Sequence, residues 1–468
     1  MASSHILSFL CLFSVIIPFT SSSSSSPDTI TISLSPLSTP HPSSDLFETL
    51  QALSSATRNR AHRLKHQHSN TKPPLIKTQA YPKSYGGYSI HLNFGTPSQT
   101  LPFVLDTGSS LVWLPCTSRY LCSKCSFPKI DPAKIPKFIP KDSSSSKIVG
   151  CQNPKCSWIF GSDVQSRCQN CKPNSRNCSQ ICPAYLIQYG LGSTAGVLLL
   201  ENLDFPGKTV PDFLVGCSIL STRQPAGIAG FGRGLESLPS QMGLTRFSYC
   251  LQSHRFDDSS KSGELILHSA TSKANTNGLS YAPFQPSPAA KNSAFRQYYY
   301  ITLRKVIVGG KQVKIPHKLL QPDSQGNGGC IVDSGSTFTF MERPVFDLVA
   351  QEFGRQMGNY SRARDVETQS GLTPCYVISS DKSASFPELT FQFKGGDKMV
   401  LPPKNYFSSV GKSGAACLTI VSDSVAGPAV AGGPAIILGN YQQQDFHVEY
   451  DLENNRLGFR PQSCGKST

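Results

Sequence analysis

The stretch Leu105-Asp106-Thr107-Gly108-Ser109-Ser110 has a counterpart later in the chain, Val332-Asp333-Ser334-Gly335-Ser336-Thr337. In each copy an apolar run delivers a carboxylate into a turn, where a hydroxyl residue and a glycine follow. The glycine allows close backbone approach, and the hydroxyls can hydrogen-bond to the other copy. If the two loops face each other, two carboxylates surround one water molecule.

The two loops together indicate a duplicated lobe. A single Asp-Thr-Gly or Asp-Ser-Gly triplet is weak evidence, because Asp, Ser and Gly are ordinary turn residues. Here both triplets follow apolar runs, at 101–105 and 330–332, and the aspartates are 227 residues apart, about the length of one lobe. Each copy is also followed by an apolar pair and a glycine, at 227–230 and 436–439. We expect such a strand beneath each aspartate loop.

The composition fits two lobes rich in β-structure. A chain of 468 residues exceeds one ordinary domain core. Only 16% of the residues are charged, and 37 glycines with 35 prolines fit a turn-rich β protein better than a helical one. We expect a strand that ends in a turn within 88–97, strands at 213–217 and 247–251, and one amphipathic helix at 346–353. The rest of the second lobe is expected to form short strands.

From about Tyr81 to Cys464 the chain resembles the pepsin-family (A1) aspartic proteases, and its cysteine-rich segment is similar to the nepenthesin-like plant branch. The resemblance implies an all-β, two-lobed pepsin-like (acid protease) fold with pseudo-twofold symmetry and few short helices. It also implies an aspartic endopeptidase that acts at acid pH on polypeptide substrates, without cofactor or metal. The expected divisions are a signal peptide at 1–24, a prosegment at 25–80, an N-terminal lobe with cysteine-rich insert and flap at 81–255 and a C-terminal lobe at 256–468.

The same resemblance assigns roles around the two catalytic candidates, Asp106 and Asp333. Hydroxyl-to-backbone bonds of Thr107 and Ser334 are expected to link the two loops. The serines at 109 and 336 are expected to contact the outer carboxylate oxygens. The supporting residues are therefore Thr107, Gly108, Ser109, Ser334, Gly335 and Ser336.

Residues 185–200 alternate and turn through glycines, which predicts a hairpin. In the family this hairpin is the flap over the cleft, so Tyr189 and Gly190 are flap residues, and Tyr189 is expected to reach Trp113. The nearest relatives usually carry Asp at the position of Leu191. Subsite specificity therefore cannot be carried over from them.

Sixteen cysteines point to an oxidising compartment, and the apolar run at 6–19 before the hydroxyl-rich run at 20–26 fits a signal peptide. Its start departs from the usual pattern, because it carries His5 but no Lys or Arg. The run is short for a membrane span, and the polar tail 460–468 carries no anchor signal. We expect secretion to the extracellular space or cell wall, with the vacuole as the alternative. The sequons at Asn177 and Asn359 are glycosylation candidates.

The cysteines have two interpretations. Two Cys-x-x-Cys pairs resemble zinc ligands, but they are far apart in the sequence, and a secretory context favours disulfides. The family suggests pairing Cys250 with Cys464 and Cys375 with Cys417. Loss of Cys11 with the signal leaves an odd number, and Cys217 and Cys330 are the candidates for unpaired thiols. The disulfide candidates are Cys116, Cys122, Cys125, Cys151, Cys156, Cys168, Cys171, Cys178, Cys182, Cys250, Cys464, Cys375 and Cys417.

The region 25–80 is also open to two interpretations. It begins Ser/Pro/Thr-rich and continues into a helical pattern at 45–64 that holds the basic stretch 58–66. It is either a disordered linker or, as the family implies, a prosegment whose cation neutralises the catalytic carboxylates until acid breaks the pairs. We predict a zymogen, with removal of the residues before Tyr81 on acidification accompanying the gain of activity.

Other functions fit the sequence less well. Some secreted relatives with this fold are inhibitors or binding proteins that have lost parts of the two triplets, whereas both triplets are intact here. A serine hydrolase lacks support, because there is no Gly-x-Ser-x-Gly and His447 lies in a strand pattern. The glycines at 230–234 lack the spacing of a nucleotide loop.

The formal net charge of +15 raises the question of an anionic partner. The basic residues are scattered without a basic helix or an aromatic-interleaved stripe, so we expect no nucleic-acid partner. We also expect no membrane anchor and a monomer.

Acidic cell-wall polysaccharide is a hypothesis that the charge motivates. Because scattered charge gives salt-sensitive binding, a specific site is indicated only by retention on a polygalacturonate column at physiological salt. Elution in the flow-through at that salt would end the hypothesis.

Overall fold

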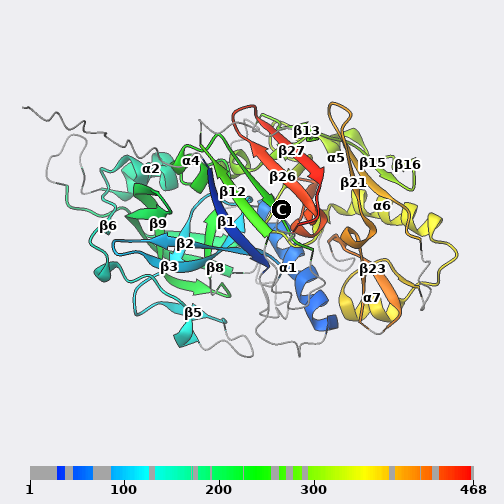
Figure 1. The fold of residues 1–468 in the computed structure, drawn as a ribbon, viewed down its shortest axis with the longest axis horizontal. Coiled ribbons are helices and arrows are strands. Elements are labelled where there is room, and N and C mark those ends of the chain that lie inside the picture. The colour runs from blue at the N-terminus through cyan, green and yellow to red at the C-terminus, as the bar shows by residue number, and fades with distance from the viewer. Residues whose placement is uncertain are drawn as a thin grey trace, which may run out of the picture.

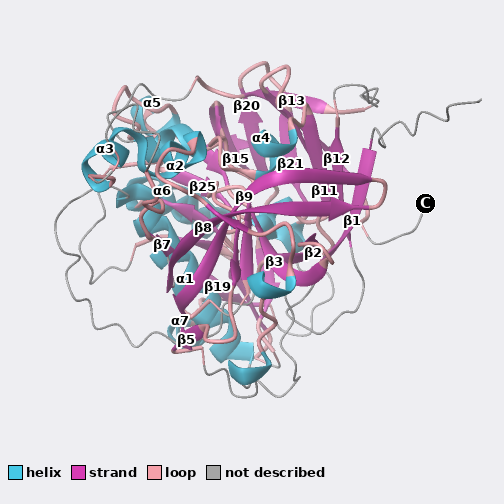
Figure 2. Ribbon diagram, turned by 90° about the vertical axis from the view of Figure 1, so that its left-hand side faces the viewer, coloured by secondary structure: helices cyan, strands magenta, loops and turns pink. Residues whose placement is uncertain are grey.

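A computed structural model describes residues 29–36, 46–66, 86–125, 132–169, 171, 178–189, 192–224, 226–253, 263–269, 278–286, 293–378, 385–411, 413–423 and 432–464. Strands dominate, as expected for the all-β, pepsin-like fold. Figure 2 shows strands running through the whole body, with most of the helices at its left and lower sides.

The duplication expected from the two aspartate loops is present as two sets of four strands. In the first, β3 (Gln99–Asp106) pairs in parallel with β10 (Gly227–Gly230), β10 pairs antiparallel with β4 (Trp113–Pro115), and β4 pairs in parallel with β9 (Lys208–Thr222). The second repeats this parallel, antiparallel, parallel order with β17 (Cys330–Val332), β25 (Ile436–Leu438), β18 (Thr339–Met341) and β24 (Ile420–Val421). Each aspartate strand therefore lies beside the expected apolar strand.

Further strands and short helices complete the first lobe. The β7–β8 hairpin forms where the alternating pattern predicted it. The elements are β2 (Tyr88–Phe94), β5 (Leu121–Ser123), β6 (Lys147–Ile148), β7 (Tyr185–Tyr189), β8 (Gly192–Phe205), α2 (Pro154–Phe160), α3 (Val164–Arg167) and α4 (Leu238–Met242).

In the second lobe the predicted helix is present and longer than expected, as α6 (Arg343–Gln356) with Pro344 in its first turn. The expectation that the rest of this lobe is strands was wrong for α5 (His317–Leu320) and α7 (Arg364–Ser370). Helix α7 is polar apart from Val366, so no apolar period marks it. The strands are β14 (Tyr300–Ile301), β15 (Leu303–Val308), β16 (Lys311–Gln312), β19 (Cys375–Val377), β20 (Leu389–Phe393), β21 (Lys398–Leu401), β22 (Phe407–Ser409) and β23 (Ala415–Leu418).

A shared sheet joins the two lobes, and it includes a strand from the N-terminal region. Its order begins β13 (Ser280–Pro283), β27 (Arg456–Pro461), β26 (Phe446–Asp451), β11 (Arg246–Cys250), β12 (Gly263–His268) and β1 (Thr29–Pro36), and β1 then pairs with β2 of the first lobe. Strand β1 lies beside β12 in Figure 1 and pairs with it antiparallel over six residues.

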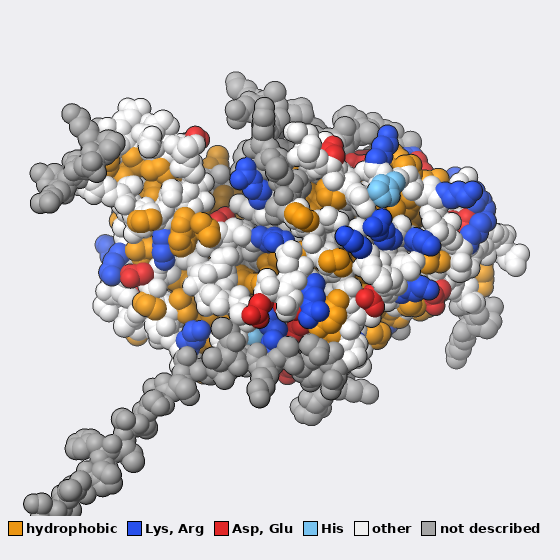
Figure 3. Space-filling view, turned by 90° about the horizontal axis from the view of Figure 1, so that it is seen from above, with side chains coloured by type: hydrophobic (Ala, Val, Ile, Leu, Met, Phe, Trp, Pro, Cys, Tyr) orange, Lys and Arg blue, Asp and Glu red, His pale blue; other side chains and the backbone are white. Residues whose placement is uncertain are grey.

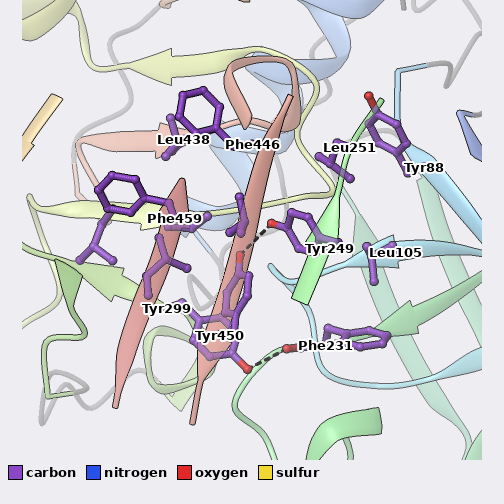
Figure 4. Packing of buried hydrophobic residues seen from close by; sticks show 14 of the residues in the cluster. Tyr88, Leu105, Phe231, Tyr249, Leu251, Tyr299, Leu438, Phe446, Tyr450 and Phe459 are labelled. Atoms are coloured by element: carbon purple, nitrogen blue, oxygen red, sulfur yellow. Dashed lines mark hydrogen bonds between the residues drawn. The ribbon is translucent and has the colours of Figure 1, made fainter. Parts of the chain in front are cut away.

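Aromatic side chains from both lobes form the core against this sheet (Figure 4). The Tyr249 and Tyr450 hydroxyls hydrogen-bond to each other at 3.1 Å, and Phe247 stacks on Tyr450 with ring centroids 4.4 Å apart. The Tyr299 hydroxyl of the second lobe donates to the Phe231 carbonyl of the first at 2.9 Å. Because these rings are fully packed, they resist relative movement of the lobes.

The N-terminal region holds the 21-residue helix α1 (Leu46–His66), which corrects the disordered-linker interpretation for the parts of 25–80 that are described. The helix lies between the two halves of the molecule in Figure 1. Its residues Leu50, Leu53, Ala61 and Leu64 are buried in one cluster with side chains of the second lobe. Burial of this apolar face explains why the segment is ordered.

Seven disulfides pair fourteen of the described cysteines, and among these residues only Cys330 is free. Cys217, expected as a candidate for an unpaired thiol, instead pairs with Cys116. The reason is strand pairing: Cys217 lies opposite Leu114 of the neighbouring strand β4, which Cys116 follows directly. The pairs are Cys116–Cys217, Cys122–Cys125, Cys151–Cys168, Cys156–Cys182, Cys171–Cys178, Cys250–Cys464 and Cys375–Cys417.

The distribution of charged side chains on the surface is relevant to the partners expected from the sequence. Lys and Arg side chains are spread over the face seen in Figure 3, with Asp and Glu side chains between them. Within the described ranges, no helix has both the length and the apolar character needed to cross a bilayer.

The disulfide set predicts the thiol content of the protein. For a chain that begins after residue 24, a thiol reagent should find one thiol per chain under denaturing, non-reducing conditions and none in the folded protein, because Cys330 is buried. Alkylation followed by peptide mass spectrometry should place the label on Cys330. Labelling of Cys116 or Cys217 in unreduced protein would contradict the pairing.

Candidate active site

The structure brings Asp106 and Asp333 together at the junction of the two lobes. Asp106 is the last residue of β3, Asp333 follows β17 directly, and their side chains are 1% and 0% exposed. The loops approach so closely that a Cβ on Gly108 would lie 2.6 Å from Asp333 Oδ1, and a Cβ on Gly335 would lie 2.5 Å from Asp106 Oδ1. Only glycine fits at either position.

The residues after the aspartates link the two loops symmetrically. The Thr107 N–H donates to the Ser334 hydroxyl oxygen (3.1 Å), and the Ser334 N–H donates to the Thr107 hydroxyl oxygen (2.9 Å). The Thr107 hydroxyl donates in turn to the Val332 carbonyl (3.3 Å). The Ser334 hydroxyl donates to the Leu105 carbonyl (3.0 Å). These four buried bonds hold the carboxylates at a fixed separation.

Each carboxylate is oriented by its own loop. The Ser109 hydroxyl donates to Asp106 Oδ2, and the Ser336 hydroxyl donates to Asp333 Oδ2, both at 2.6 Å. The N–H of the glycine two residues after each aspartate donates to Oδ1 at 2.9 Å. The outer oxygens are thus held by hydroxyls, and the inner Oδ1 atoms face the opposite loop.

Arg60 of α1 lies directly between the two carboxylates. Its Nη2 donates to Asp106 Oδ1 at 2.5 Å and to Asp333 Oδ1 at 2.8 Å, and its Nε donates to Asp333 Oδ2 at 2.6 Å. One nitrogen therefore bonds both inner oxygens. The basic stretch 58–66 was expected to supply such a cation, and Arg60 is the residue that does so.

The electrostatic environment shifts the pKa values of the two aspartates in opposite directions. Burial raises the pKa of Asp106 in spite of Arg60, and the charge of Asp333 raises it further. Burial also acts to raise the pKa of Asp333, but the charge and hydrogen bonds of Arg60, with the Ser336 hydroxyl, outweigh it and lower that pKa. Burial alone would lower the pKa of Arg60, but the two carboxylates raise it, so the guanidinium stays charged. The charge of Arg60 thus opposes the effect of burial on both carboxylates.

Polar contacts fasten α1 to the second lobe on either side of Arg60. Arg58 donates to the carbonyls of Ser422 (2.8 Å) and Gly371 (2.5 Å). His62 Nε2 lies 2.5 Å from Asp423 Oδ1. Lys65 Nζ forms an ion pair with Glu342. The helix therefore docks on the second lobe and presents Arg60 to the carboxylates.

The flap contact expected from the sequence is present. The Trp113 Nε1–H donates to the Tyr189 hydroxyl oxygen at 2.8 Å, and Trp113 is fully buried. The turn residues Gly190 and Leu191 lie outside the described residues, as does the sequon residue Asn177. Asn359 is exposed in the turn that follows α6. No group of three potential metal ligands occurs among the described residues.

Two supporting residues were not found from the sequence. Asn440 Nδ2 donates to the Ser334 carbonyl at 2.9 Å, and the Tyr450 hydroxyl donates to the Thr107 hydroxyl oxygen at 3.4 Å. Asn440 follows the 436–439 motif directly, so its position was a usable signal. Tyr450 reaches the loop only through the shared sheet, and nothing in its sequence neighbourhood indicates this.

Comparisons with known proteins match both halves of the chain. A family model described as xylanase inhibitor N-terminal matches residues 88–267, and one described as xylanase inhibitor C-terminal matches residues 298–461. A probable aspartyl protease of Arabidopsis thaliana is 32% identical over 81% of this chain and 82% of its own length. The aspartic proteinase nepenthesin-2 of Nepenthes gracilis is 34% identical over 84% of this chain and 81% of its own length.

Solved structures confirm the two-lobed fold. The crystal structure of edgp superposes with a TM-score of 0.63 at 18% identity, covering 93% of this chain and 95% of its own. Soybean basic 7S globulin superposes with a TM-score of 0.60 at 16% identity, covering 94% and 99%.

The geometry predicts that Arg60 controls the docking of α1. Arg60 lowers the pKa of Asp333, so their ion pair stabilises the docked helix while Asp333 is ionised, and this contribution is lost as the pH falls through the lowered pKa. Arg60→Gln removes the contribution at every pH and leaves two buried carboxylates uncompensated, at a cost of about 3–5 kcal/mol.

Hydrogen exchange of the α1 amides at pH 7 checks this prediction. Exchange in Arg60→Gln should be at least about a hundredfold faster than in the unchanged chain. Arg58→Gln is the matched control, because it loses contacts with the second lobe but none with the carboxylates, and its effect should be smaller. Equal exchange in Arg60→Gln and the unchanged chain would contradict the role of Arg60.

Proposed function

Because the chain belongs to the plant pepsin-like aspartic proteases, we propose that it is a secreted aspartic endopeptidase, made as an inactive precursor, that hydrolyses peptide bonds at acid pH. The observation that carries the proposal is the convergence of both Oδ1 atoms on the single Arg60 nitrogen. Once Arg60 leaves, that position is within hydrogen-bonding reach of both carboxylates. A water molecule placed there meets a base on one side and an acid on the other.

The proposed reaction uses the two aspartates as one unit. At acid pH they share one proton, since two like charges this close do not both ionise readily. The ionised carboxylate takes a proton from the water, and the water oxygen attacks the scissile carbonyl. The protonated carboxyl donates its proton to the developing oxyanion. The carboxyl that took the proton of the water then donates it to the amide nitrogen, the C–N bond breaks as the carbonyl reforms, and the other carboxylate takes up the hydroxyl proton that is released. All of these steps belong to the pair, so its titration is not divided between Asp106 and Asp333.

Support for a precursor comes from α1, which fills the space between the flap and the carboxylates. In this proposal, acid protonates the carboxylates, weakens their ion pairs with Arg60 and allows removal of the residues before Tyr81. The seven disulfides support folding in an oxidising compartment, as secretion requires.

A binding or inhibitor protein without peptidase activity is the second candidate, and the descriptions of the two matching family models favour it. The complete set of aspartates, hydroxyls and glycines argues for the peptidase, because binding alone does not need buried carboxylates held this closely. Digestion of a denatured protein at acid pH separates the two.

Asp106→Asn and Asp333→Asn test the mechanism. Each variant should lose at least about a thousandfold in kcat/KM for a peptide substrate at acid pH, because neither amide can act in the shared proton transfer. The circular dichroism spectrum should be unchanged, because Asn keeps the shape of the side chain. In the unchanged chain, pepstatin should inhibit cleavage. Undiminished cleavage by either variant would exclude this mechanism.

A further inference from the structure

Helix α1 places a second arginine in the cleft, one turn beyond Arg60. Arg63 follows Arg60 by three residues, so both project from the same face of the helix. The Arg63 guanidinium carbon lies 5.0 Å from the centre of the Tyr189 ring, within the range of a cation–π interaction. Arg60 bonds to the two carboxylates, and Arg63 lies next to those carboxylates, in the space beneath the flap.

Tyr298 bounds this space on the side of the second lobe. Its hydroxyl donates to the carbonyl of Leu64, the residue after Arg63, at 3.3 Å, and its side chain is 1% exposed. Tyr189 of the first lobe therefore contacts the Arg63 guanidinium, and Tyr298 of the second lobe bonds to the backbone of the next residue.

The Arg63 side chain contacts the Tyr189 ring. Within the described ranges no ion pair involves Arg63. Burial lowers its pKa to about 10, Tyr189, Tyr298 and Asp106 act in the opposite direction, and the charge of Arg60 adds to the lowering. Arg63 is still protonated at neutral and acid pH, so the cleft holds a partly buried cation.

Removal of α1 makes this space more favourable for a cation. The charge of Arg60, which repels Arg63, leaves together with the helix. The shared negative charge of Asp106 and Asp333 is then no longer neutralised by an arginine. The face of Tyr189 beside a net negative charge suits a flat or extended cation, because an aromatic face carries a negative potential.

We propose that the space between Tyr189 and Tyr298 is a substrate pocket that accepts an arginine or lysine side chain flanking the scissile bond. Arg63 occupies it in the precursor as a substrate side chain would in the mature protein. The proposal rests on the proposed peptidase function and adds to it the class of peptide cleaved.

Matched peptides that differ at one flanking residue test the pocket in the acid-processed protein. That residue is arginine, its neutral analogue citrulline, or leucine. Citrulline keeps the shape of arginine but lacks its charge. The kcat/KM of the citrulline peptide should therefore be roughly fivefold to thirtyfold lower than that of the arginine peptide, which is the effect of a desolvated cation–π contact. Equal cleavage of the arginine and citrulline peptides would overturn the proposal.

Substitutions of Tyr298 distinguish the contribution of its ring from that of its hydroxyl. Tyr298→Leu should lower kcat/KM for the arginine peptide by the same factor while changing that for the leucine peptide less than about threefold. Tyr298→Phe, which keeps the ring, should retain the preference for arginine. A parallel loss for both peptides in Tyr298→Leu would assign Tyr298 a structural role only and overturn the pocket.

Reduced-bond versions of the same peptides distinguish failure of the pocket from failure of the peptidase. Their binding is measured by calorimetry and needs no hydrolysis. Tighter binding of the arginine peptide than of the citrulline peptide supports the pocket even if no peptide is cleaved, in which case the proposed function alone fails. Equal binding of the two, with the leucine substrate cleaved, overturns the pocket and leaves the peptidase standing.

Discussion

The buried hydrogen bonds between Thr107 and Ser334 are the constraint on which the site depends. Two carboxylates at the centre of a protein repel each other and lose hydration, so loops free to separate would move apart. Reciprocal N–H to hydroxyl bonds prevent this, and each hydroxyl also reaches a carbonyl of the opposite strand. The shared sheet and the aromatic core behind it hold both lobes in the register that these bonds require.

The same position serves two states of the protein. In this structure a single nitrogen of Arg60 lies between the inner carboxylate oxygens and compensates their buried charge. In the proposed active form a water molecule takes that position and gives its proton to one of the same oxygens. Under this proposal the contacts of Arg60 identify the atoms that would carry out hydrolysis, and Arg63 identifies a neighbouring space in the same way.

The sequence predicted those parts of the site that the duplication repeats, because each aspartate loop carries its own hydroxyls and glycine. For the cation that binds the carboxylates, the sequence predicted only the range 58–66. The choice of Arg60 within that range depends on which face of α1 docks on the second lobe. Cys217 was misjudged because its apolar neighbours resemble those of a buried thiol, whereas its pairing follows from the register of β4 and β9. Helix α7 was not predicted because its residues are polar apart from Val366, although Gly371 ends it in the left-handed conformation.

A crystal structure of the acid-processed protein at acid pH tests the central claim most directly. The account predicts that α1 is absent and that one solvent molecule lies within hydrogen-bonding distance of both Asp106 Oδ1 and Asp333 Oδ1, at the position of the Arg60 nitrogen. A structure in which no single atom can bond to both oxygens, or in which another cation of the processed chain occupies that position, would contradict it.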